Sequence, residues 1–328
     1  MTGLPIAIDA MGGDKAPVEI IAGAKRARDE HNLDLVLVGP ESIRSEAGEL
    51  DLMLASEVIA MDEDPTKAVR IKKDSSIVVA AEAVRDKQAS AMISAGNTGA
   101  VMAAALLRMG RLPQVARPCI ATPLVIPGDL NRHPTVMVDA GANVECQPAW
   151  LVQFAQMAAA YAKLRYKLPK VTVALLSNGE EASKGNPLTK ETHELLSATK
   201  GIDFIGNVEG RDLLAGKADV IVTDGFTGNV ALKSLEGALS VFMDVLFKVI
   251  GTDENTKAAG NVLIPHLLTY GEALDPESTG GALLLGVDGI CVISHGSSSA
   301  KAILNAALLA DDMAKANLVE GVKEAILS

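Results

Sequence analysis

The chain has 328 residues, of which 48% are apolar, so it is long enough to bury a substantial core. Its 30 basic and 41 acidic residues give a formal net charge of −11, and only 3% are aromatic, which argues against nucleic acid as a partner. The three widely spaced cysteines fit a reducing cytoplasm, while the start lacks a secretion signal and no apolar run reaches the roughly 18 residues of a membrane span.

Strand-like and helical segments alternate along the chain. A helix is expected from Pro17 to about Glu30 and a second, rich in small residues, over 98–109. This alternation predicts a single α/β unit over residues 1–328, a three-layer α/β/α Rossmann-like sandwich with a mostly parallel sheet. Strands are expected near 4–9, 34–39, 57–60, 91–94, 119–126, 134–139, 171–177, 203–206, 219–223 and 289–294.

An apolar helical hairpin is predicted over residues 235–272. In its first helix, 238–250, the only polar residues are Ser240, Asp244 and Lys248, which recur every four positions on one narrow stripe. The second helix, 257–270, should be kinked near Pro265. Burial in the core of its own chain, a dimer interface and a membrane surface all remain open for this apolar surface. The expected contact residues are Val262, Leu263, Leu267 and Leu268.

Four predicted strands end at a Ser or Thr and open into loops of Gly, Asn, Ser, Thr and Asp. These strand ends are Ser94, Ser177, Thr223 and Ser294. Because the carboxyl ends of parallel strands share one edge of a sheet, and the helices that follow present unpaired N–H groups there, we expect an anion site at this edge. Phosphate is the anion that this pattern favours.

Several catalytic motifs are absent. The chain has no P-loop, no Gly-x-Gly-x-x-Gly after its first strand, no Gly-x-Ser-x-Gly and no His-Glu-x-x-His. This argues against a P-loop kinase, a nicotinamide-dependent dehydrogenase, a serine hydrolase and a zinc enzyme. The loops hold few groups able to form a covalent intermediate and many able to position an anion, so direct transfer is favoured.

Most candidate site residues have both a chemical and a structural interpretation. Lys184 could reach phosphate or an oxyanion, or be solvated. Asn229 could donate to an oxyanion or begin a helix as its N-cap, and Asp224 could cap a helix or orient Lys184. His295 could bind phosphate or move a proton, or be structural. Asn97 and Thr98 stand where a helix should begin, so they could cap it or contact phosphate.

Seven segments spread along the chain carry a resemblance to a known family: 8–14, 72–76, 94–100, 138–143, 176–181, 223–229 and 294–298. Together they resemble the bacterial phosphate acyltransferases of the PlsX family. The resemblance implies transfer of a long-chain fatty acyl group from acyl carrier protein to inorganic phosphate, which gives acyl phosphate for phospholipid synthesis. It also implies a homodimer with a fold similar to phosphotransacetylases and to isocitrate and isopropylmalate dehydrogenases, associated peripherally with the membrane.

No metal or organic cofactor is required for such a reaction, because phosphate is already a nucleophile at neutral pH. Our mechanistic hypothesis assigns Lys184 and Asn229 to oxyanion or phosphate stabilisation, with Asp224 orienting them. The residues expected to bind substrate are Ser94, Asn97, Thr98, Asn178, Gly225, Thr227, His295 and Ser297.

Acyl carrier protein is acidic, so this acidic chain needs a local basic patch to bind it. The first candidate patch is Lys67, Arg70, Lys72 and Lys73, and the second is Lys163, Arg165, Lys167 and Lys170. Product could pass to a membrane glycerol-3-phosphate acyltransferase. Two rival functions remain: a short-chain phosphotransacetylase or phosphotransbutyrylase that uses acyl coenzyme A, and a non-catalytic membrane scaffold for lipid enzymes.

Overall fold

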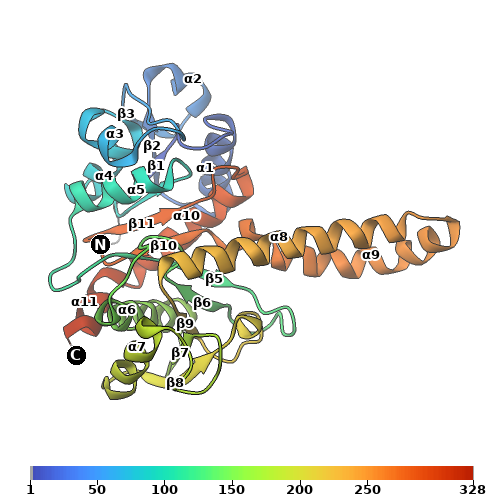
Figure 1. Cartoon of the computed structure of the whole chain (residues 1–328). Coiled ribbons are helices and arrows are strands. Elements are labelled where there is room, and N and C mark those ends of the chain that lie inside the picture. The colour runs from blue at the N-terminus through green and yellow to red at the C-terminus, as the bar shows by residue number, and fades with distance from the viewer. Residues whose placement is uncertain (1–2, 328) are drawn as a thin grey trace.

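One 11-stranded sheet runs through the molecule in the order β3-β2-β1-β4-β11-β10-β5-β6-β9-β7-β8, with helices on both faces (Figure 1). The structure is a computed structural model that describes residues 3–327. The strands are β1 (Ile6–Asp9), β2 (Leu35–Gly39), β3 (Asp51–Leu54), β4 (Ala91–Ser94), β5 (Cys119–Leu124), β6 (Thr135–Val138), β7 (Thr172–Leu176), β8 (Asp203–Val208), β9 (Val220–Val222), β10 (Ala282–Leu285) and β11 (Ile290–Ile293).

The predicted three-layer α/β/α sandwich with a mostly parallel sheet is confirmed. Helices α1, α6 and α10 pack on one face around Phe154 and Tyr161, and α4 and α5 pack on the other around Ile77 and Met92. Each such apolar side chain contributes about 1.5–3 kcal/mol on burial. The helices are α1 (Val18–His31), η1 (Glu41–Ile43), α2 (Arg44–Ala47), α3 (Pro65–Ile71), α4 (Ser76–Arg85), α5 (Thr98–Ala104), η2 (Ala105–Met109), α6 (Pro148–Tyr166), α7 (Pro187–Ala198), η3 (Gly210–Asp212), α8 (Gly225–Ile250), α9 (Glu254–Leu274), η4 (Pro276–Thr279), α10 (Ala300–Lys315) and α11 (Leu318–Leu327).

Two strands, β3 and β10, were not predicted from the sequence, and one predicted strand is absent from the structure of residues 3–327. Edge strand β3 has only a short apolar run, Leu52 to Leu54, after an exposed Asp51, and β10 is a short strand inside a glycine-rich segment. The strand expected at 57–60 does not form, because only Glu57 makes an isolated bridge, with Ser75. A short apolar run without neighbours in register is therefore not enough to join the sheet.

The sheet contains strands of both directions, and this changes where the strand-end loops lie. Strand β10 is antiparallel to both β11 and β5, and β5 is antiparallel to β6. Three reversals separate β4 and β11 from β6, β9 and β7, so the two groups point in opposite directions. The expectation that all four Ser- and Thr-ended strands share one edge is therefore wrong. The short β10–β11 and β5–β6 connections produce antiparallel pairs, which long crossovers do not.

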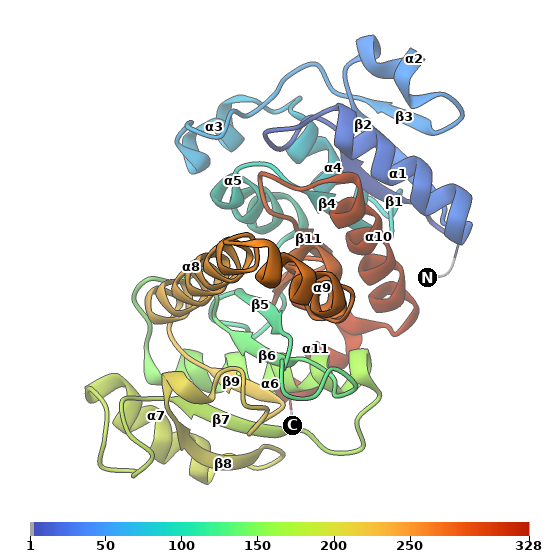
Figure 2. The same ribbon diagram turned by 90° about the vertical axis from the view of Figure 1, so that its right-hand side faces the viewer.

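Helices α8 and α9 project from the body as a long antiparallel hairpin (Figures 1 and 2). Its apolar side chains are largely exposed, for example Phe242 at 64% and Val262 at 69%, so burial within the core of its own chain is excluded. Gly260 is the buried residue of α9, and a Cβ there would lie 2.2 Å from Ile250 Cγ2, so glycine permits the close helix contact. Among residues 3–327, no helix has both the length and the apolar character needed to cross a bilayer.

Candidate functional site

A cavity of about 500 Å³ lies over the middle of the sheet, where the start of α5, the first turns of α8 and the loop after β11 converge. Of the residues predicted from the sequence, it brings together Thr98, Asn229, His295 and Ser297. Lys233 of α8 and His295 of the β11 loop bridge the two groups of oppositely directed strands, with Lys233 Nζ 3.5 Å from His295 Nε2. One site therefore forms from loops that leave the sheet in opposite directions.

The loop after β11 supplies hydroxyl groups to this cavity. Ser294 is only 4% exposed, and its Oγ finds no hydrogen-bond partner among residues 3–327. His295 Nδ1 lies 2.8 Å from Ser297 Oγ, and the Ser298 amide donates to the His295 carbonyl at 3.0 Å. A buried hydroxyl without a partner is costly, so a ligand that bonds Ser294 Oγ would be favoured in this cavity.

Helix α8 begins at the loop after β9 and carries Asn229 into the cavity. Asp224 is its N-cap, and its two carboxylate oxygens accept from the Thr227 amide at 2.9 Å and the Thr227 hydroxyl at 2.7 Å. The capping interpretation of Asp224 is therefore right, and that of Asn229 is wrong because Asn229 lies in the second turn. Gly225 is buried, with its amide donating to the Asn143 carbonyl at 2.8 Å.

The side chain of Asn229 sits against Gly141, where an added Cβ would lie 3.6 Å from Asn229 Oδ1. Gly141 has φ +138°, in the left-handed range that favours glycine. The loop after β6 therefore leaves room for the Asn229 amide beside Ala140 in the cavity wall. A carboxamide in this position can donate a hydrogen bond to an oxygen that gains negative charge.

Two buried aspartates hold the strand-end loops in place. Asp139, after β6, accepts from the amides of Ile120 at 3.0 Å, Ala142 at 2.9 Å and Asn143 at 2.8 Å. Asp9, at the end of β1, accepts a hydrogen bond from Ser94 Oγ at 2.6 Å. The Ser94 hydroxyl, which was expected to bind substrate, is therefore used in a hydrogen bond within the protein. Burial raises the pKa of Asp9 above its ordinary value, and hydrogen bonds from serines and amides oppose the rise.

Asn97 acts as a helix cap. Its Oδ1 accepts from the Ala100 amide at 3.1 Å, and its Nδ2 donates to the carbonyl oxygens of Met61 at 2.9 Å and Glu63 at 3.2 Å. All of its amide groups are thus used within the protein, which supports the structural interpretation. The neighbouring Thr98 is exposed and lines the cavity at the start of α5.

The loop after β7 holds the other predicted polar residues away from this cavity wall. Lys184 and Asn178 are both exposed, and neither lines the cavity. The stem of Lys184 packs against Gly179, where a Cβ would lie 2.6 Å from Lys184 Cγ. Asp224 bonds Thr227, so its geometry is that of a cap and not of a group that orients Lys184.

Sequence reasoning missed the charged residues of the cavity. Lys233 Nζ lies 2.8 Å from Glu236 Oε2, and both line the cavity with Asp275 and Glu277. Lys233 follows Asn229 by four residues, which places the two on the same face of a helix. This spacing was the available signal. Within residues 3–327, no cluster of three or more His, Cys, Asp or Glu side chains is arranged to hold a metal ion.

The two predicted basic patches are partly neutralised by ion pairs. In the first, Lys72 Nζ contacts Glu63 Oε1 at 2.5 Å and the Val58 carbonyl at 2.7 Å, whereas Lys67, Arg70 and Lys73 are exposed. In the second, Arg165 pairs with Asp312.

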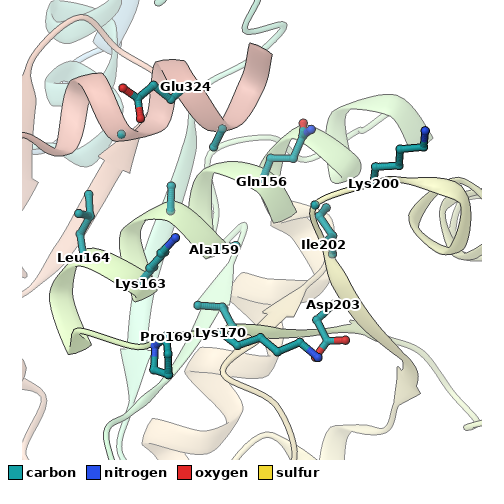
Figure 3. Close-up of a pocket in the computed structure, with 15 residues that line it drawn as sticks. Gln156, Ala159, Lys163, Leu164, Pro169, Lys170, Lys200, Ile202, Asp203 and Glu324 are labelled. Carbon is teal, nitrogen blue, oxygen red and sulfur yellow. The ribbon is translucent and has the colours of Figure 1, made fainter. Parts of the chain in front are cut away.

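A larger hollow of about 670 Å³ lies beside the second patch, between α6, α11 and the loop before β8 (Figure 3). Lys163 and Lys170 line it, and Lys170 pairs with Asp203 at 2.8 Å. None of the predicted catalytic or substrate-binding residues lies in this hollow.

The sequence comparisons with known proteins agree on one family, and the structural comparison shows the fold. A family model described as "Fatty acid synthesis protein" matches residues 4–320. A phosphate acyltransferase from Nostoc punctiforme is 45% identical over 318 residues, which cover 95% of this chain and 93% of that protein. One from Pelotomaculum thermopropionicum is 46% identical over 332 residues, covering 99% and 96%. A solved phosphotransacetylase from Streptococcus pyogenes shares the fold with a TM-score of 0.58 at 15% identity, covering 100% of this chain and 96% of that one.

Proposed function

Because the chain belongs to the family of bacterial phosphate acyltransferases, we propose that it transfers a long-chain fatty acyl group from acyl carrier protein to inorganic phosphate. The product is an acyl phosphate for phospholipid synthesis. The observation that carries this proposal is the cavity in which the unpartnered Ser294 Oγ, the Asn229 amide, His295 and Lys233 converge. Hydroxyl, amide and ammonium groups of this kind bind phosphate and stabilise an oxyanion.

The proposed reaction is a direct displacement. An oxygen of hydrogen phosphate attacks the thioester carbonyl carbon, and the Asn229 amide donates to the carbonyl oxygen as it becomes negative. The carbon–sulfur bond then breaks, and the thiolate receives the proton that the phosphate carried. We propose that the His295 imidazole, which lines the cavity with its Nδ1 2.8 Å from Ser297 Oγ, relays that proton. No outside oxidant or reductant is consumed.

The experiment that tests this function compares acyl donors. Purified protein is given inorganic phosphate with a long-chain acyl-acyl carrier protein, a long-chain acyl coenzyme A or acetyl coenzyme A, and acyl phosphate is trapped with hydroxylamine. We expect the highest kcat/KM with acyl carrier protein. A preference for acetyl coenzyme A would identify a short-chain phosphotransacetylase instead, and no hydroxamate with any donor would leave only a non-catalytic scaffold.

For acyl carrier protein, the proposed docking site is the exposed group Lys67, Arg70 and Lys73 on and after α3. An acidic partner would be attracted to these cations, and the attraction would weaken as salt increases. Lys72 contributes less because it is already paired with Glu63. Charge reversal at Lys72 and Lys73 should raise the KM for acyl-acyl carrier protein at low salt, whereas an unchanged KM would remove this patch from the proposal.

The α8–α9 hairpin is proposed to join two copies of the chain and to contact a membrane surface from the cytoplasm, where acyl phosphate can pass to a glycerol-3-phosphate acyltransferase. Val262, Leu263 and Leu268 are more than half exposed and supply the apolar contact, with the partly buried Leu267 beside them. Leu263→Glu should reduce flotation with liposomes. Unaltered flotation would argue against membrane contact at this position.

A further inference from the structure

Lys233 is the one lysine or arginine among the described residues that line the cavity. Its Nζ lies 2.8 Å from Glu236 Oε2 and 3.5 Å from His295 Nε2. Glu236 is one turn further along α8 and lines the same cavity. The cation best placed for an anionic substrate is therefore already in contact with a carboxylate of its own helix.

The other two carboxylates of the cavity wall are engaged elsewhere. Asp275 pairs with Lys301 at 3.1 Å, and Glu277 accepts from the amide and hydroxyl of Ser299 at 3.0 and 2.5 Å. Glu236 has no such partner besides Lys233 among the hydrogen bonds and ion pairs described for residues 3–327. A phosphate dianion that enters this cavity, which is lined by carboxylates, therefore needs the Lys233 ammonium. That ammonium is already paired with Glu236.

We propose that Lys233 binds the attacking phosphate and that Glu236 competes with phosphate for the Lys233 ammonium. The ion pair is easily exchanged, because the Lys233 and Glu236 side chains are 50% and 33% exposed and such solvated pairs are weak. Phosphate carries two negative charges against one on the carboxylate, so it attracts the ammonium more strongly at equal distance. Displaced from Lys233, the Glu236 side chain can turn to solvent.

This proposal rests on the proposed phosphate acyltransferase function, and it predicts opposite effects for the two partners. Lys233→Met should raise the KM for phosphate at least tenfold, and Lys233→Arg should restore much of the loss because it keeps the charge. Glu236→Gln should lower the KM for phosphate several-fold, because the amide no longer neutralises Lys233. A purely structural ion pair predicts instead that neither variant shifts the KM for phosphate.

Lys315→Met is the matched control, since Lys315 pairs with Asp311 of its own helix at 2.6 Å and lies outside the cavity. Its KM for phosphate should equal that of the wild type. Calorimetry without acyl donor measures the binding of inorganic phosphate to each protein directly. This readout is independent of turnover. Tighter binding by Glu236→Gln and weaker binding by Lys233→Met would support the proposal. Unchanged or weaker binding by Glu236→Gln would overturn it, even if the wild type forms acyl phosphate.

Discussion

At the scale of single residues, Asn229 carries the proposed oxyanion contact. Its side chain is exposed in the cavity wall and is not needed to cap α8, since Asp224 does this. Asn229→Ala should therefore lower kcat by about 10²–10³-fold, the usual cost of removing one oxyanion donor, without changing the thermal unfolding midpoint. Steady-state rates of acyl phosphate synthesis beside a thermal unfolding curve will measure both.

The same assay on Lys184→Ala tests the second half of the mechanistic hypothesis. Lys184 lies in the loop after β7, outside the cavity wall. If it nevertheless stabilises the oxyanion, Lys184→Ala should lower kcat. Should Lys184→Ala and Asn229→Ala both fold and dimerise normally yet keep full synthesis, neither residue has the role assigned to it. Asn261→Ala, on the exposed hairpin, serves as a control for the loss of an asparagine side chain.

Asp9 gives a prediction about pH. Burial raises the pKa of its carboxyl above the ordinary value in the folded protein. The folded state then holds the proton more tightly than the unfolded state, so the contribution of Asp9 to stability is fully present below the unfolded pKa, near 4, and is lost as pH rises through the folded pKa. The free energy of unfolding of wild type minus that of Asp9→Asn should decrease from pH 4 upward. Denaturant titrations between pH 4 and 8 that give a constant difference would contradict this.

Four residues of the cavity were predictable from local pattern: Thr98, Asn229, His295 and Ser297 all follow strands that end in polar, glycine-rich loops. Lys233 was not singled out, because an isolated helical lysine is typical of a solvated face, and only the meeting of α8 with the β11 loop places it beside His295. Ser94 shows the converse limit. Its position after a strand is typical of an anion-binding loop. Its hydrogen-bond partner Asp9 is 85 residues away in the sequence, so this contact could not be predicted from local pattern.

At the scale of elements, the hairpin could be predicted because its all-round apolar pattern extends over many residues. Its first helix is longer than expected: α8 begins at Gly225, so the same helix that carries Asn229 and Lys233 in the cavity continues into the exposed hairpin. The order and direction of β10 and β5 were not predictable from strand patterns alone. Their antiparallel pairing depends on which segments meet across the sheet.

The close contact of α8 with α9 at Gly260 gives a prediction at this scale. Gly260→Ala should weaken the hairpin, because the added Cβ would overlap Ile250 Cγ2, and the branched Ile250 side chain cannot easily move aside. Gly271→Ala in the same helix is the matched control, since a Cβ there meets no atom within 4 Å. It should stabilise α9 by about 1 kcal/mol through helix propensity.

Amide hydrogen exchange in α8 and α9 measures both changes as local opening free energies. Faster exchange in Gly260→Ala and slower exchange in Gly271→Ala are expected. If both substitutions slow exchange, the two helices do not touch closely at Gly260.

At the scale of the whole molecule, one sheet with two strand directions places the cavity over its centre, and the hairpin leaves from the same place (Figure 2). This arrangement links the proposed anion-binding wall, formed by Ser294, His295 and Lys233, to the exposed apolar surface of the hairpin through helix α8. An enzyme that joins phosphate to a long acyl chain needs both kinds of surface close together. The coupling of the two through α8 is the structural basis of the proposed function.

The most direct test follows phosphate itself by ³¹P NMR in a mixture of purified protein, a long-chain acyl-acyl carrier protein and inorganic phosphate. We expect a new acyl phosphate resonance that grows in step with free thiol, one thiol for each acyl phosphate. Thiol release without acyl phosphate would mean that water, not phosphate, is the acceptor. That result, or no reaction at all with a folded protein, would contradict the proposed transfer of the acyl group to phosphate.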